Sequence, residues 1–116
     1  MDKPHKKLKV WQDAMGTARD IYRLTNLLPS EEKFGLISQM RRAAVSIPCN
    51  IAEGAARRGK KVFINFLSIA QGSLSELDTQ LDLCVLLEFL EAKVLGEVEE
   101  KLIRVDKMLT GLIRSL

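Results

Sequence analysis

The sequence VLGEVEEKLIRVDKMLTGLIRSL, at residues 94–116, carries the clearest folding signal in this chain. Its aliphatic residues recur at alternating steps of three and four, from Leu95 to Leu116. This is the spacing of the a and d positions of a heptad, which form one stripe along an α-helix. Because such a stripe has to be buried against other helices, the segment predicts an all-α fold.

Three further segments, at residues 8–26, 31–58 and 61–90, also show helical periodicity. The apolar stripe of the first consists of Trp11, Ala14, Met15, Ala18, Ile21, Tyr22 and Thr25. The third segment is the longest, and its stripe runs from Phe63 to Val85. Long amphipathic helices joined by a few residues favour antiparallel neighbours. We therefore expect an antiparallel, up-down-up-down four-helix bundle.

Two residues mark features of the second segment. Ser30, followed by Glu31 and Glu32, predicts the N-cap of the helix, with acidic side chains at the positive end of its dipole. Pro48 lies inside the apolar pattern. Because proline lacks a backbone N–H and its ring clashes with the preceding turn, we expect the second helix to be kinked at Pro48.

Length and composition allow one domain at residues 1–116, with residues 1–7 as a flexible basic tail. A hydrophobic content of 47% argues against disorder. One histidine and two cysteines leave little to build a site from, so no metal or cofactor is expected. Cys49 and Cys84 form either a disulfide or metal clip, or two small buried thiols; their spacing favours the thiols of a reducing cytosol. Without a signal-peptide pattern or membrane span, we expect a cytoplasmic protein with no membrane partner.

Charge is unevenly distributed along the chain. Residues 1–61 hold 13 Lys and Arg against 6 Asp and Glu, a net +7, whereas residues 62–116 hold 5 against 9, a net −4. The run RRGKK at residues 57–61 lies at the junction of the second and third helices. A phosphate there would offset the unfavourable position of Lys60 and Lys61 at a helix N-terminus. The alternatives are a solvated loop and a phosphate-binding patch shared with the N-terminal lysines.

The third helix carries more apolar surface than one stripe. Ile69, Leu83 and Leu87 point some 120–160° away from its main stripe, taking about 100° per residue. Either the other helices wrap this end, or the face is buried by self-association, which we favour.

The second helix carries a polar face around Arg42. The residues that share it are Gln39, Ser46, Asn50, Glu53 and Arg57. This face is either solvated or in contact with another subunit, where charges and amides would fix the register. Catalysis is the weakest interpretation, because Glu53 has no nucleophile, second acid or histidine near it in the pattern.

Two long motifs give the chain a family resemblance. The stretches FGLISQMRRAAVSIPCNIAEG (34–54) and FLSIAQGSLSEL (66–77), with LKVW at 8–11, resemble the four-helix bundle proteins encoded in 23S rRNA intervening sequences. Cys49 stands where Ser is common, and Gly59-Lys60 replaces a Ser-type cap. The resemblance implies a left-handed antiparallel bundle, a ring-like homopentamer and no enzymatic activity. The family is related to the accessory protein of diversity-generating retroelements, which works with a reverse transcriptase and nucleic acid.

Charge and resemblance together predict a non-enzymatic, oligomeric protein that binds structured RNA such as rRNA, or DNA. The predicted nucleic-acid contacts are Lys6, Lys7, Lys9, Arg41, Arg42, Arg57, Arg58, Lys60 and Lys61. The predicted oligomer contacts are Gln39, Asn50, Glu53, Ile69, Glu76, Gln80, Leu83 and Leu87. The alternative is a protein–protein assembly or adaptor module, for example an accessory subunit of a nucleic-acid enzyme, without direct nucleic-acid contact.

Overall fold

The structure, a computed structural model, describes residues 1–116. It contains four long helices, α1 (Lys9–Thr25), α2 (Leu36–Ala56), α3 (Lys60–Leu86) and α4 (Gly96–Ser115). Three short 3₁₀ turns accompany them, η1 (Pro4–Lys7), η2 (Ser30–Glu32) and η3 (Ala92–Leu95). There is no strand, so the predicted all-α class with four helices is confirmed.

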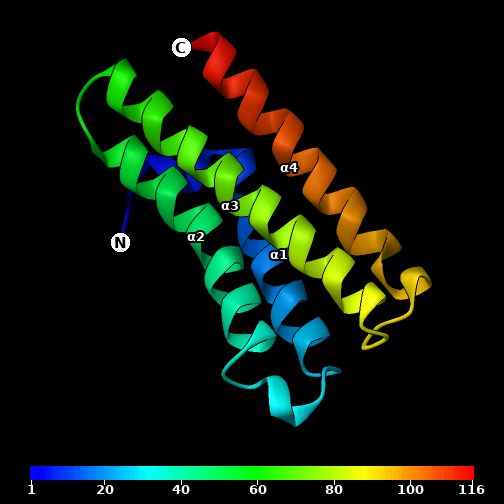
Figure 1. Cartoon of the computed structure of the whole chain (residues 1–116). Helices are drawn as coiled ribbons and strands as arrows, with labels where there is room; N and C mark the ends of the chain where they lie inside the picture. Colours follow the sequence, from blue (N-terminus) through cyan, green and yellow to red (C-terminus); the bar gives the residue numbers. More distant parts are fainter.

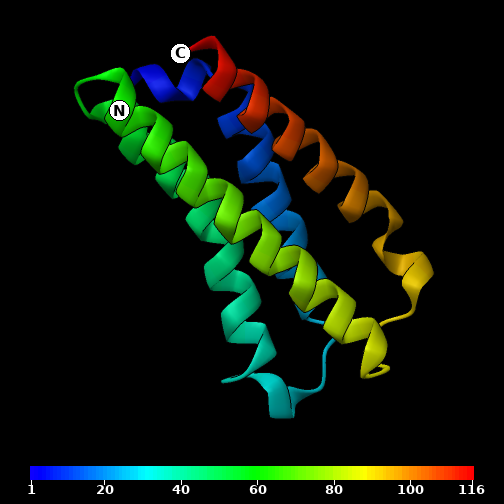
Figure 2. The same ribbon diagram turned by 45° about the horizontal axis from the view of Figure 1, so that its top comes forward.

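Each long helix packs against two others. α2 contacts α1 and α3, and α4 also contacts α1 and α3, which closes the bundle. The sequence colouring in Figure 1 shows the chain running down α1, up α2, down α3 and up α4. Figure 2 shows the same order of helices, with α4 beside α3 and α1. The bundle is elongated, 44 × 24 × 21 Å, and its two ends are therefore well separated.

The core is one cluster of aliphatic side chains contributed by all four helices. The α4 heptad is buried from Leu95 to Leu109, as its periodicity predicts, and only the last turn is half-buried. Deep in the core, the Cys84 thiol lies 3.7 Å from the Met40 sulfur. Cys49 is exposed instead, so the expectation of two buried thiols is wrong for that residue.

The apolar stripe of α1 is narrower than the sequence suggests. Its buried residues are Val10, Ala14, Thr17, Ile21, Leu24 and Thr25. Met15 and Tyr22, which were assigned to the stripe, are 47% and 43% exposed. Each follows a buried residue directly, and one step along a helix turns the side chain by about 100°. That rotation carries Met15 out of the core and leaves Tyr22 at the edge of the contact with α2, beside Arg41.

Two predicted helix ends differ from the structure. Ser30 begins the separate turn η2, and the Leu36 N–H at the start of α2 donates instead to the Glu32 carboxylate at 3.1 Å. The third helix ends at Leu86 and not at residue 90. There Glu88 adopts φ 63°, and the amides of Phe89 and Leu90 turn back onto the Cys84 carbonyl. This turn buries Leu90 without extending the helix.

Along the α2–α3 contact, Pro48 and Gly54 are both buried. Pro48 lies inside an α2 that continues without a break, and a bend of the helix there stays a prediction. Gly54 marks a close approach of the two helices, because a Cβ at this position would lie 2.7 Å from the Cβ of Phe66. Any larger residue would push the two helices apart next to the connection that carries the RRGKK run.

Candidate nucleic-acid interface

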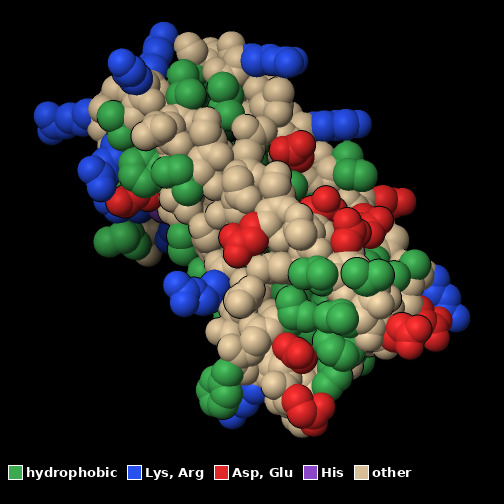
Figure 3. Space-filling model, in the orientation of Figure 1, with side chains coloured by type: hydrophobic (Ala, Val, Ile, Leu, Met, Phe, Trp, Pro, Cys, Tyr) green, Lys and Arg blue, Asp and Glu red, His purple; other side chains and the backbone are tan.

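Cations from separate parts of the chain meet at one end of the bundle. In Figures 1 and 2, the N-terminal turn η1, the α2–α3 connection and the C-terminus lie at the same end. Figure 3 shows Lys and Arg side chains projecting there, whereas Asp and Glu side chains gather over the middle and the opposite half. We call this end the basic end and define it by Lys6, Lys7, Lys9, Arg57, Arg58, Lys60 and Lys61.

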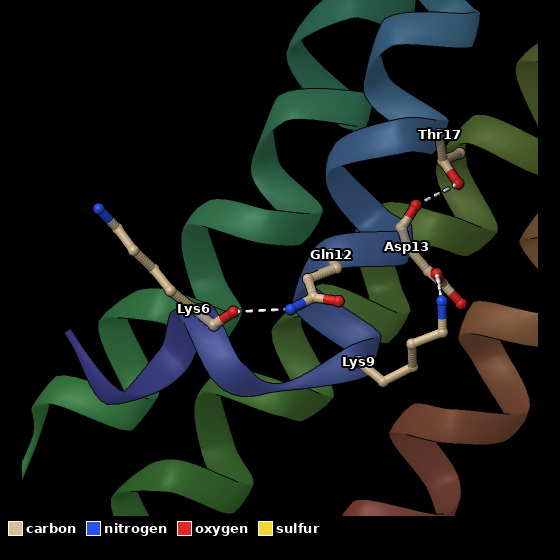
Figure 4. Close-up of polar contacts among 5 residues, drawn as sticks. All are labelled: Lys6, Lys9, Gln12, Asp13 and Thr17. Atoms are coloured by element: carbon tan, nitrogen blue, oxygen red, sulfur yellow. Dashed lines mark hydrogen bonds and ion pairs between the residues drawn. The ribbon is translucent and has the colours of Figure 1, made fainter. Parts of the chain in front are cut away.

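The N-terminal lysines stand on an ordered turn. η1 packs against α1 and α2, and the Gln12 amide donates to the Lys6 carbonyl at 2.9 Å. Figure 4 shows the Lys6 side chain extending away from these contacts. Lys9 is instead paired with Asp13 at 2.9 Å. The segment predicted as a flexible tail thus contains a 3₁₀ turn, which Pro4 favours because its ring presets φ.

At the α2–α3 connection, one cation is paired with other side chains and three are not. Arg57 donates to Glu53 at 2.9 Å, and its guanidinium lies 5.5 Å from the centroid of the Phe66 ring. Arg58, Lys60 and Lys61 are exposed and take part in none of the ion pairs of the chain.

The chain turns sharply between these cations. Gly59 adopts φ 99°, a conformation open to glycine, and no side chain caps the first turn of α3. The unbonded amides of that turn add to the positive potential of the neighbouring side chains.

Arg41 and Arg42 lie apart from the basic end. About 15 residues of α2 separate them from Arg57, roughly 22 Å along the helix. Arg41 is held against α1, with Nε donating to Thr25 Oγ1 at 2.9 Å and Nη2 donating to Asn26 Oδ1 at 3.0 Å. The nine predicted nucleic-acid contacts therefore divide into seven at the basic end and these two arginines.

The predicted oligomer contacts occupy one face formed by α2 and α3. Gln39, Glu53 and Glu76 are exposed there, and Asn50 donates to Ser46 Oγ at 2.9 Å. Ser46 in turn shares a 2.8 Å hydrogen bond with Ser73 across the two helices. Gln80 is buried within its own chain, 4% exposed, and its carbonyl oxygen has no hydrogen-bond partner.

Apolar side chains are exposed at the far end of α3. Leu83 and Leu87 are 38% and 49% exposed, and Ile69, about four turns earlier in α3, is 46% exposed. Figure 3 shows apolar side chains gathered over this end of α3 and the α3–α4 connection. The other helices do not wrap these three residues, as the self-association interpretation requires.

Sequence reasoning missed three exposed apolar residues near that end. Leu86 is 76% exposed, Phe34 is 89% exposed, and Tyr22, which the sequence pattern places on the buried stripe of α1, is 43% exposed. Phe34 lies two residues after the end of η2, a turn that the sequence pattern predicts as the first turn of the second helix. The signal that could have found it is the Phe34-Gly35 pair, since glycine before an apolar run indicates a helix boundary.

The groups that could bind a metal ion lie apart, and one buried thiol has a shifted pKa. No group of three His, Cys, Asp or Glu residues is arranged to hold a metal ion. Burial, and then the charge of Glu32, raises the pKa of the Cys84 thiol above its ordinary value of 9.0. None of the helices combines the length and the apolar character that crossing a membrane would need.

Comparison with known proteins identifies the family. The chain resembles a protein of unknown function from the S23 ribosomal protein family of Bacteroides thetaiotaomicron, with a TM-score of 0.83 and 26% sequence identity over 90% of this chain and 95% of the other. No curated protein matches it. The family described as 23S rRNA-intervening sequence protein matches residues 6–111, from the N-terminal turn to the last turns of α4. The chain therefore belongs to the 23S rRNA-intervening sequence protein family.

Proposed function

We propose that this protein is a non-enzymatic homo-oligomer that binds nucleic acid through its basic end. The observation that supports this is the meeting of cations from η1, the start of α1 and the α2–α3 connection at one end of the bundle. A nucleic-acid backbone releases its condensed counterions when such cations replace them, which supplies sequence-independent affinity. The family description, a 23S rRNA-intervening sequence protein, suggests structured RNA as the ligand.

The basic end suits phosphates better than bases. No aromatic ring stands free there, because Trp11 is half-buried with its ring 5.0 Å from that of His5, and Phe66 lies under Arg57. Lys60 and Lys61 at the uncapped start of α3 each cost about 0.3–1 kcal/mol at low salt. A bound phosphate reverses the sign of that interaction.

The exposed apolar residues of α3 support self-association. Ile69, Leu83 and Leu87 belong to a line that continues through Ser73 and Glu76 with the 3–4 spacing of a heptad. The resemblance implies a homopentameric ring. In a ring the basic ends would repeat about the axis, and linked sites of this kind gain roughly 10²- to 10⁴-fold in avidity.

Filter binding to rRNA fragments over a salt series tests the proposal. We expect the triple variant Arg58→Gln, Lys60→Gln, Lys61→Gln to lower the slope of log affinity against log salt by up to about 2.7, at roughly 0.9 per phosphate contact. The control triple Arg19→Gln, Arg23→Gln, Lys93→Gln removes the same charge nearer the opposite end of the bundle and should leave the slope nearly unchanged. Equal effects of the two triples, or no affinity at about 50 mM salt, would contradict the basic end as the binding surface.

A second candidate is an adaptor that binds a protein and makes no direct nucleic-acid contact. Leu83, Leu86 and Leu87 favour it, because an exposed apolar patch suits a protein partner as well as a second copy. Such a partner could be a nucleic-acid enzyme such as a reverse transcriptase. Light scattering separates the two candidates: a single-chain mass in the isolated protein, with no affinity for RNA, favours the adaptor.

A further inference from the structure

A hollow on the side of the bundle brings together features that the basic end lacks. It has a volume of about 580 Å³ and lies between the end of α1, the η2–α2 connection and the first half of α2. The residues that line it are Tyr22, Lys33, Phe34, Ile37, Ser38, Arg41, Arg42, Val45 and Ser46. A second hollow of about 470 Å³ continues it toward α3 and shares Phe34, Ser38, Arg42 and Ser46.

Two aromatic rings border the hollow and face solvent. Phe34 is 89% exposed and Tyr22 is 43% exposed, although both rings are large apolar surfaces. The guanidinium of Arg41 lies 4.6 Å from the centroid of the Tyr22 ring, so the two groups form a cation–π pair at one wall of the hollow. The ring of Phe34 has only the Lys33 ammonium nearby, 5.5 Å from its centroid. It therefore leaves an open face for another planar group.

Three cations around these rings have no carboxylate partner. Lys33, Arg41 and Arg42 take part in none of the ion pairs of the chain. The hydrogen-bond acceptors of Arg41 are all neutral, namely Thr25 Oγ1, the Tyr22 carbonyl and Asn26 Oδ1. These bonds hold the arginine in place without cancelling its charge, so the hollow is preorganised for an anion.

The acidic groups beside the hollow accept hydrogen bonds from neutral amides. Glu32 accepts the Leu36 N–H at the start of α2. Glu76, which lines the adjoining hollow, accepts from the Gln80 amide at 3.3 Å. Neither carboxylate forms an ion pair with Arg42, which lines both hollows.

We propose that this hollow binds a nucleotide with an unstacked base, the base lying on Phe34 and the phosphate between Arg42 and Lys33. A planar base next to a phosphate is a ligand that combines an aromatic face with a negative charge, and single-stranded nucleic acids are recognised on such aromatic and guanidinium surfaces. The volume lies within the range of small-ligand pockets. The ligand is either a free nucleotide or an unpaired nucleotide of an RNA strand.

This inference deepens the proposed function and rests on it only where the nucleotide is part of an RNA. The hollow lies roughly 22 Å along α2 from the basic end, so an RNA engaging both would present its backbone to one and an unpaired nucleotide to the other. A free nucleotide would fill the hollow without the basic end. The two sites can therefore be tested separately on the full-length protein.

The experiment compares three probes by fluorescence anisotropy and competition. They are a labelled oligoadenosine RNA of about ten nucleotides, a blunt RNA duplex of about 16 base pairs, and AMP as competitor. We expect Phe34→Ala to weaken oligoadenosine binding by roughly 5- to 100-fold and to leave duplex binding unchanged. Arg42→Gln should weaken oligoadenosine and AMP alike. The matched control is Leu27→Ala, which removes another exposed apolar side chain, 62% exposed, outside the hollow.

Each outcome decides between the sites. AMP that displaces oligoadenosine identifies the hollow as a site for a free nucleotide as well, and oligoadenosine binding without AMP competition restricts the ligand to an RNA strand. Duplex binding with no binding of oligoadenosine or AMP overturns the nucleotide site and leaves the proposed function intact. Duplex binding that is unaffected by the triple variant Arg58→Gln, Lys60→Gln, Lys61→Gln overturns the basic end alone, whether or not oligoadenosine binding depends on Phe34. If Phe34→Ala changes the mass in light scattering and not the oligoadenosine affinity, the hollow is a contact between copies and the proposal is wrong.

Discussion

The two ends of this bundle use the same pair of helices in opposite ways. At the basic end, α2 and α3 approach closely over Gly54, the phenylalanines of α3 turn inward, and charge faces solvent. At the other end, Phe34, Leu86 and Leu87 face solvent. A close approach of α2 and α3 thus accompanies the surface suited to phosphates, and exposed apolar side chains accompany the surface suited to rings and apolar partners. The comparison shows that one amphipathic helix pair can present two chemically distinct binding surfaces.

The largest expected effect comes from placing charge in the apolar surface of α3. We expect Leu83→Lys with Leu87→Lys to reduce the mass in light scattering to that of one chain, 13.0 kDa. Because Leu83 and Leu87 have only 38% and 49% of their surface left to bury, each lost leucine removes about 0.6–1.5 kcal/mol of burial, and each unpaired ammonium adds a desolvation cost in the contact. Circular dichroism should still show folded helices, because both positions are exposed within the single chain.

The matched control for that double variant is Ile103→Lys. Ile103 is 55% exposed on α4, away from the line of α3 that we assign to self-association. Its substitution should leave the mass unchanged. A double variant that retains the wild-type mass would remove the α3 line from the subunit contact.

The next effect tests the close packing of the basic end. Gly54→Ala would bring a Cβ to 2.7 Å from the Phe66 Cβ, which cannot move without its helix, and should lower the free energy of unfolding by about 1–3 kcal/mol. Gly72→Ala is the matched control. It lies in α3 with nothing within 4 Å and should raise the free energy of unfolding by about 0.5–1 kcal/mol. Urea denaturation measures both, and the same sign for the two would refute the close approach.

A smaller effect follows from the buried thiol of Cys84. Burial raises the pKa of Cys84 above 9.0, so the neutral thiol is the form favoured in the folded chain. Stability from this preference is fully present below pH 9.0 and is lost as the pH rises through the folded-state pKa, at no more than about 1.4 kcal/mol per pH unit.

Denaturation midpoints measured from pH 8 to pH 11 test this. The difference between the wild-type protein and a cysteine variant at each pH gives the contribution of that thiol to stability. Cys84→Val should flatten the alkaline loss, and Cys49→Val, at the exposed cysteine, should retain it. An unchanged alkaline loss in Cys84→Val would mean that other groups cause it.

The sequence predicts the buried parts of this molecule better than its exposed parts. The α4 heptad from Leu95 to Leu109 is correctly predicted, because burial on one face imposes its period directly on the residue types. Tyr22 is misplaced, because periodicity does not distinguish the edge of a stripe from its centre. The start of α2 is misplaced as well, since the Glu32 carboxylate and not Ser30 receives the first amide.

The candidate sites divide in the same way. The basic end is predictable in its main part, because Arg57 to Lys61 are contiguous in the sequence. The hollow at Phe34 is not predictable, because it depends on how the end of α1 lies against α2, and no local pattern records that placement.

The smallest expected effect also separates the two interpretations of the polar face of α2. Glu53 and Arg57 form an ion pair of 2.9 Å with side chains about half exposed, 49% and 55%. Such pairs contribute about 0.3–0.5 kcal/mol, so Glu53→Gln should change the free energy of unfolding by no more than that. If the face is solvated and Arg57 belongs to the basic end, the released guanidinium becomes free for a phosphate, and the salt slope of RNA binding steepens by up to about 0.9. If Glu53 instead holds a neighbouring subunit, the variant alters the mass in light scattering and leaves the slope as it was. The same substitution thus assigns Glu53 either to the basic end or to the assembly, because only one of the two readouts should move.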